Sequence, residues 1–223
     1  ANESSLLPPG LPLELFVTAT NFWGYPQTIA LHSPAEIRER EHRQIFHFHH
    51  WPGASRGARA QLGAGHLPSL AFAARATSSF PGAFPPARLA EMDDLCAERD
   101  ATWHGRASFI DEQLGDLRRT GEDPEDAAFI DGSVLMNKPI SVALDAVQRH
   151  PAHRQTDRRL VYLEPNPAIE REVPHEIPGF FTTLKGALSD IPRHQPMRDD
   201  LAEIAGFNEQ IRLNRQVIDA VRP

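Results

Sequence analysis

A short apolar run that ends in a carboxylate and a glycine constrains this chain more than any other feature. Residues 127–131 read Ala-Ala-Phe-Ile-Asp, Gly132 follows, and Pro139 precedes an apolar helical pattern. The run predicts a short strand ending at Asp131, because apolar runs bounded by turn residues are typical of strands. Gly132 permits a sharp reversal of the backbone, and Pro139 suits the first turn of a helix, where the N–H groups lack partners. The pattern places a carboxylate where α/β proteins build their sites, although a carboxylate there is more often a plain turn or cap residue.

Apolar periodicity predicts several elements before this strand. We expect a strand over residues 13–19, with residues 28–31 as its hairpin partner. Ser33, Pro34 and Glu36 have the spacing of a helix start, which predicts a charged surface helix over residues 33–43. An Ala-rich segment over residues 68–79 predicts a helix buried against the sheet.

The elements predicted after Asp131 decide the fold class. A helix is expected from about Ile140 to Val147, and the apolar run at residues 159–163 reads as a second buried strand. A strand, helix and strand of this length require a parallel, right-handed crossover. We therefore expect an α/β fold with a mainly parallel sheet flanked by helices.

Composition excludes some classes of protein. The formal net charge of -7 argues against nucleic acid as the main partner, since phosphate binding needs a concentrated basic face. Cys96 is the only cysteine, so no disulfide forms within the chain and no all-cysteine zinc site exists. No apolar run approaches the ~20 residues needed for a transmembrane segment. The N-terminus lacks a signal-peptide pattern, so we expect a cytoplasmic or membrane-peripheral protein.

Three segments resemble one known family. Residues 70–86, Leu-Ala-Phe-Ala-Ala-Arg-Ala-Thr-Ser-Ser-Phe-Pro-Gly-Ala-Phe-Pro-Pro, resemble the A-x-R-A-S-S-x-x-P-x-x-F-P-P signature of patatin-like acyl hydrolases. Residues 15–21 are similar to the strand that precedes this signature in the family. Residues 131–139 are similar to the family's D-G-[GA]-x-x-x-N-x-P, with Ser133 in place of the usual Gly or Ala. The resemblance is closest to the large bacterial patatin-related proteins.

The resemblance implies a function and a fold. Patatin-like hydrolases cleave carboxylic esters of lipids with a Ser-Asp dyad, without a cofactor, and Asp131 corresponds to the general base. The family's glycine-rich oxyanion loop and nucleophilic serine lie upstream of the strand expected at residues 13–19. The resemblance therefore implies a partial patatin-like three-layer fold and a fragment of a larger polypeptide that is inactive alone. Phe80, Phe84 and Leu135 would then surround an acyl chain, unless they only fill the core.

The resemblance also divides the chain into domains. Residues 1–165 correspond to the later part of the hydrolase domain, with a helical insertion over residues 89–126 that forms a surface excursion or a lid. Residues 166–223 read as a linker and a helical extension, in which Leu201, Ile204 and Ile211 begin an apolar stripe.

Ser55 and Arg75 need separate treatment. Ser55 lies in Gly53-Ala54-Ser55-Arg56-Gly57, which fits the G-x-S-x-G pattern of a nucleophile elbow. The glycines that follow weaken the required helix by roughly 1 kcal/mol each, so the segment reads as a loop. Arg75 lies within an apolar segment and needs a partner, either in a structural salt bridge or beside the ester.

Two other functions remain open at this stage. The chain could be a module without catalytic activity that binds a lipid or a protein partner through its C-terminal helices. His42, His47, His49 and His50 could form a metal site, because alternate residues of a strand share one face. Solvated or hydrogen-bonded histidines are the commoner reason for such a pattern, so no metal ligand is assigned.

Overall fold

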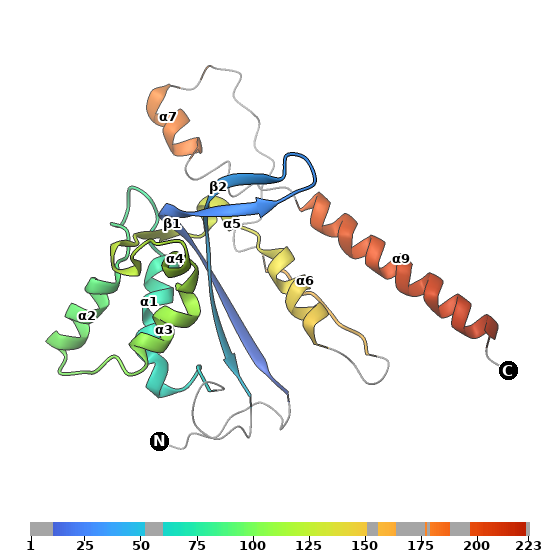
Figure 1. Ribbon diagram of the computed structural model, residues 1–223, viewed down its shortest axis with the longest axis horizontal. Helices are drawn as coiled ribbons and strands as arrows, with labels where there is room; N and C mark the ends of the chain where they lie inside the picture. The colour runs from blue at the N-terminus through green and yellow to red at the C-terminus, as the bar shows by residue number, and fades with distance from the viewer. Residues whose placement is uncertain are drawn as a thin grey trace. The chain divides into compact units, whose positions relative to one another are not determined.

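The computed structural model describes residues 11–51, 60–150, 156–163, 177, 179–187 and 197–221 (Figure 1). The chain divides into two compact units, Ala1–Asn137 and Lys138–Pro223. The predicted boundary at residue 165 lies outside the described residues. Asp131 and the aromatic core both belong to the first unit.

The first unit contains a three-stranded antiparallel sheet. Its strands are β1 (Leu13–Ala30), β2 (Glu36–His50) and β3 (Phe129–Asp131), in the order β2-β1-β3. β1 pairs antiparallel with β2 on one side and with β3 on the other. The predicted mainly parallel, three-layer patatin-like sheet is therefore wrong. Its error lay in pairing the Asp131 strand with a later one, whereas β3 pairs with β1 and residues 159–163 form no strand.

The predicted helix over residues 33–43 is also wrong, because β2 occupies most of that range. Residues 28–30, expected to form a separate partner strand, are the last part of β1 itself. The partner strand of the hairpin is β2, which begins at Glu36. Residues 36–41 pair with residues 25–30 of β1, which gives the charged run cross-strand partners that a helix start does not offer. Long-range pairing here overrides a local helix signal.

The helices of the first unit lie beside the half of the hairpin in which residues 13–20 of β1 pair with residues 43–50 of β2 (Figure 1). They are η1 (Ala64–His66), α1 (Leu67–Thr77), α2 (Leu89–Glu98), α3 (Arg106–Gln113), α4 (Gly115–Arg119), η2 (Pro124–Asp126) and α5 (Ser133–Met136). The predictions of a helix near residues 68–79 and of a strand ending at Asp131 are confirmed by α1 and β3. The range 89–126 contains α2, α3, α4 and η2, whose buried residues include Leu89, Ile110 and Leu117. These helices contribute to the core itself.

Phe46 lies at the centre of the core. Its ring contacts Phe72 of α1 at 5.8 Å, Phe109 of α3 at 5.8 Å and Phe129 of β3 at 5.5 Å between ring centroids. All four rings are buried. Such aromatic pairs contribute about 0.5–1.5 kcal/mol each beyond the area that they bury. This cluster fixes β3, and therefore Asp131, against the hairpin.

Two glutamine side chains close the outer edge of β2. Gln113 Oε1 accepts a hydrogen bond from His47 N at 2.8 Å, and Gln113 Nε2 donates to His47 O at 2.9 Å. Gln61 Oε1 accepts from His49 N at 3.1 Å, and Gln61 N donates to His49 O at 3.0 Å. The two residues satisfy backbone groups that an edge strand otherwise leaves unpaired.

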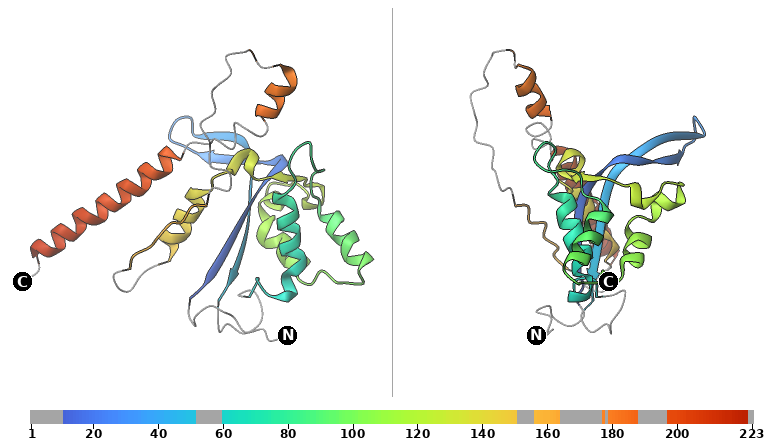
Figure 2. Two further views of the ribbon diagram at one scale, coloured as in Figure 1. Left: turned by 180° about the vertical axis from the view of Figure 1, so that it is seen from behind. Right: turned by 90° about the vertical axis from the view of Figure 1, so that its left-hand side faces the viewer.

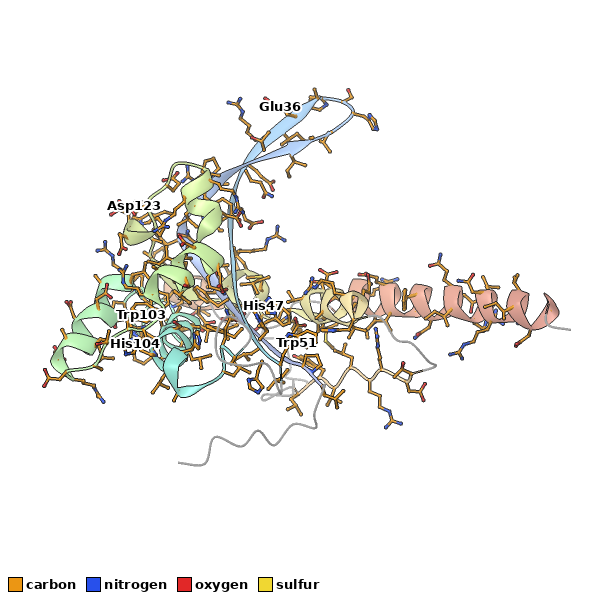
Figure 3. The ribbon with its side chains drawn as sticks, turned by 60° about the horizontal axis from the view of Figure 1, so that its bottom comes forward. Glu36, His47, Trp51, Trp103, His104 and Asp123 are labelled. Atoms are coloured by element: carbon orange, nitrogen blue, oxygen red, sulfur yellow. The ribbon has the colours of Figure 1, made fainter. Side chains whose placement is uncertain are left out.

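The other half of the hairpin extends beyond the helices as a two-stranded ribbon (Figure 2). Register is irregular between Thr20 and Tyr25, and from there nearly every side chain of both strands as far as Arg40 is exposed. Figure 3 shows Glu36 at the far end of this ribbon, well away from Trp103. Only the other half of the hairpin, which includes residues 13–21 of β1, pairs with β3 and supports the candidate site.

The second unit is helical where it is described. It contains α6 (Ile140–Arg149), α7 (Phe180–Lys185) and α9 (Arg198–Val221), so the helices predicted after Pro139 and near the C-terminus are confirmed. The buried strand predicted at residues 159–163 is wrong, because these residues form no strand and Val161 and Leu163 are exposed. Within the described part of the chain, no helix has the length and apolar character that a bilayer crossing requires.

Candidate functional site

The backbone of Asp131 is held on two sides. Asp131 pairs with Ala19 across β1, and its carbonyl oxygen accepts a hydrogen bond from Thr20 Oγ1 at 3.1 Å. On the other side, Asp131 N donates to the carbonyl oxygen of Ser79 at 3.0 Å. The carboxylate therefore leaves a backbone that is bonded both to a strand and to the end of α1.

The two oxygens of the Asp131 carboxylate differ. Oδ1 accepts a hydrogen bond from Ser133 N at 2.8 Å, which is the side-chain turn typical of Asp before a helix. Oδ2 has no hydrogen-bond partner among the residues that the structure describes. The side chain is half-buried. One oxygen thus orients the group, and the other remains able to accept a hydrogen bond.

Gly132 explains how the turn comes so close to β1. A Cβ atom at this position would lie 2.4 Å from both the carbonyl oxygen and Oγ1 of Thr18. No side chain fits there, so the backbone of the turn approaches β1 as only glycine allows. Ser133, which departs from the family pattern, starts α5 and supplies the N–H that holds Asp131.

The three segments that carry the family resemblance meet at this turn. β1 contributes Thr18 and Thr20, and β3 contributes Asp131. The segment from α1 contributes the carbonyl of Ser79, and Ala87, immediately after it, exchanges two backbone hydrogen bonds with Phe129, at 2.8 and 2.9 Å. Sequence reasoning gave no role to Thr18, Thr20 or Ser79, because a register between distant segments has no local signal.

Arg75 has structural partners. Its Nε atom donates to Glu91 Oε1 at 3.0 Å, Nη1 donates to Ser79 Oγ at 2.5 Å, and Nη2 donates to the carbonyl of Pro85 at 3.2 Å. Ser79 is fully buried and Oγ also donates to the carbonyl of Arg75. The guanidinium therefore braces the segment after α1, which carries the Ser79 carbonyl that binds Asp131.

The three apolar side chains proposed to surround an acyl chain are partly exposed. Phe84 is 59% exposed and Leu135 is 45% exposed, while Phe80 is half-buried. The interpretation of these residues as core filling therefore fails for Phe84 and Leu135. Both remain available to contact an apolar molecule, because neither is covered in the described structure.

The histidines of β2 have separate environments. His42 Nδ1 lies 2.8 Å from the carbonyl oxygen of Asn21. His47 Nε2 lies 3.2 Å from Glu14 Oε1, and its ring stacks on Phe16. Nδ1 of His50 is buried without a hydrogen-bond partner in the described residues. Across that part of the chain, no group of three or more His, Cys, Asp or Glu side chains is placed to hold a metal ion.

Ser55 and its neighbours at residues 52–59 lie outside the described residues, so the loop predicted there stays a prediction. No protein-family model, curated protein or solved structure matches the chain. The candidate site therefore depends on its own geometry and on the residue pattern of the three segments.

Proposed function

We propose that Asp131 is the general base of a serine acyl hydrolase that cleaves carboxylic esters of lipids, and that the nucleophilic serine comes from polypeptide outside these 223 residues. One observation carries the proposal. The three segments that resemble patatin-like hydrolases converge on a carboxylate with one oxygen held by Ser133 N and the other without a partner in the described residues.

Each step of the reaction uses the free oxygen of Asp131. As the serine Oγ attacks the ester carbonyl, Asp131 Oδ2 accepts the hydroxyl proton and the carbonyl oxygen becomes an oxyanion. The C–O bond to the alcohol then breaks, and the alcohol leaves with the proton from Asp131. In the second half of the reaction, Asp131 removes a proton from water, which attacks the acyl-serine. The bond between the acyl carbon and serine Oγ then breaks, Asp131 returns the proton to Oγ, and the carboxylic acid leaves.

The hydrogen bond from Ser133 N favours this role. It holds the carboxylate at a fixed angle without occupying the second oxygen, and pre-positioned groups of this kind contribute typically ~10²–10⁴-fold in rate. Phe84 and Leu135 offer exposed apolar surface for an acyl chain. Arg75 has no direct part in the proposed chemistry, because each of its three nitrogens already donates to a protein partner.

The test is Asp131→Asn in the natural polypeptide that contains these residues. We expect cleavage of a medium-chain p-nitrophenyl ester to fall at least ~100-fold, because the amide cannot accept the serine proton. Labelling of the serine by a fluorophosphonate probe should fall in parallel. Asp94→Asn is the matched control, since Asp94 is an exposed carboxylate of α2. Unchanged hydrolysis in Asp131→Asn would show that this carboxylate is not the base.

A further inference from the structure

The first unit contains a pocket of about 200 Å³ that is separate from the Asp131 turn. Phe48 of β2 and Phe109 of α3 lie in its wall, together with Ser69 of α1, and Asp131 is not in its lining. The proposed hydrolase chemistry makes no use of this pocket. Because it lies between elements of one compact unit, its walls are fixed by the same aromatic core that supports the sheet.

Most polar groups in the lining already have partners. Gln113 uses its amide oxygen and nitrogen on His47, and Gln61 uses its amide oxygen on His49. Gln61 Nε2 donates to Glu112 Oε2 at 2.6 Å. Ser69 Oγ accepts from Trp103 Nε1 at 2.9 Å. These groups shape the pocket, but they have little remaining capacity to bind a ligand.

Glu112, His66 and Ser108 are the exceptions, and Glu112 is the only carboxylate among them. Gln61 binds only one of the two carboxylate oxygens of Glu112, and Oε1 has no hydrogen-bond partner among the described residues. The pocket lining contains no lysine, no arginine and no second carboxylate. Glu112 is exposed, and the Gln61 amide holds its carboxylate in direction at the pocket. His66 is the other titratable group of the lining.

The remaining wall combines His66, Gly105 and Ser108 with the buried rings of Phe48 and Phe109. The rings of Phe48 and Phe109 stack with 6.3 Å between centroids and 18° between planes. Aromatic rings attract both apolar groups and cations that approach them within about 6 Å. Cavities of about 150 Å³ accommodate benzene, so a space of this size takes a ligand of one ring or a short chain.

We infer that this pocket binds a small organic cation, an ammonium group attached to a single ring or a short hydrocarbon chain. The ammonium donates to Glu112 Oε1, and the hydrocarbon part lies against Phe48 and Phe109. An anion of the same size is disfavoured, because it would face Glu112 and the lining offers neither lysine nor arginine to compensate. A neutral molecule would leave the free carboxylate oxygen without an ionic partner.

The test uses benzylammonium as the probe and the 223-residue chain. Titration calorimetry or saturation-transfer NMR should detect binding with Kd on the order of millimolar, as expected for so small a ligand. Benzoate and benzyl alcohol have nearly the same volume and should bind at least about tenfold more weakly, because neither forms the charge-assisted hydrogen bond. Equal binding of either molecule, or no binding of benzylammonium, would overturn the inference.

Three variants locate the site. Glu112→Gln keeps the size of the side chain and should weaken benzylammonium binding at least about tenfold. Glu98→Gln is the matched control on the exposed surface of α2 and should bind as the parent chain does. Ser108→Lys adds a positive charge at an exposed position of the lining and should also weaken binding at least about tenfold, which keeps the test decisive if Glu112→Gln fails to fold. Parental affinity in Ser108→Lys, or in a folded Glu112→Gln, would refute the assignment.

Discussion

Gly132 leaves no room for a side chain beside Thr18. This single residue brings the turn after β3 against β1, and the Asp131 carboxylate takes its position from that contact. The neighbouring Ser133 contributes through its backbone, because its N–H holds Asp131. At the scale of residues, the site therefore depends on one absent side chain and one backbone donor.

Replacement of Gly132 by alanine should destabilise the first unit. The added Cβ would lie 2.4 Å from the backbone oxygen of Thr18, so the strands must shift, at a cost of about 1–3 kcal/mol or more. Urea unfolding followed by tryptophan fluorescence measures this change. Gly65→Ala is the control, because a Cβ at Gly65 meets no atom within 4 Å. Equal stability of the two variants would contradict the contact.

Glu41 gives the hairpin a predictable dependence on pH. The hydrogen bond from the Arg43 guanidinium lowers the pKa of Glu41 below its ordinary value of 4.5, and burial opposes this shift only in part. A lowered folded-state pKa stabilises the fold above the unfolded value, and this contribution is lost as the pH falls through the folded-state pKa. Because Arg43 is largely exposed, solvent screening keeps the contribution small.

The variant Glu41→Gln should therefore lose less stability on acidification than the parent chain does. The unfolding free energy is measured at neutral pH and well below pH 4.5, and the difference between the two values should be smaller in Glu41→Gln than in the parent chain. Glu98→Gln, on the exposed face of α2, should follow the parent chain. The same acid sensitivity in all three proteins would argue against a stabilising role for the Glu41–Arg43 pair.

At the scale of elements, those with a local apolar pattern could be predicted from sequence, whereas β2 could not. α1, β3 and α6 were predictable because each has a local apolar pattern of its own period. Residues 36–43 instead have a good local helix start, yet they form strand because β1 lies opposite. The position of Asp131 at a strand end was therefore readable from sequence, whereas its neighbours Thr18, Thr20 and Ser79 depend on strand register and were not.

The edge of β2 offers a test at the same scale. In Gln113→Ala, the N–H and C=O groups of His47 lose their side-chain partner, which should destabilise the first unit by about 1–3 kcal/mol. Hydrogen exchange should show reduced protection of the His47 amide. Gln27→Ala, on the exposed part of β1, removes a glutamine of the same size from the ribbon and should change neither quantity. Full protection of His47 in Gln113→Ala would contradict the edge closure.

At the scale of the whole molecule, the expected fold class was wrong although several elements were right. The first unit has an antiparallel sheet, and the second unit, where it is described, is helical. A strand–helix–strand unit was inferred from an apolar run at residues 159–163 that the structure leaves without strand partners. Pairing between distant segments determines whether neighbouring strands run parallel or antiparallel. Composition and periodicity do not reveal which segments pair.

The Phe46 ring joins parts of the chain that are synthesised at different times. Its partners Phe72, Phe109 and Phe129 come from two helices and the last strand of the first unit. The cluster therefore closes only after all these segments have been brought together, at an entropic cost that rises with loop length. We expect this unit to fold in one cooperative transition, and to fold more slowly than a helical bundle of similar length.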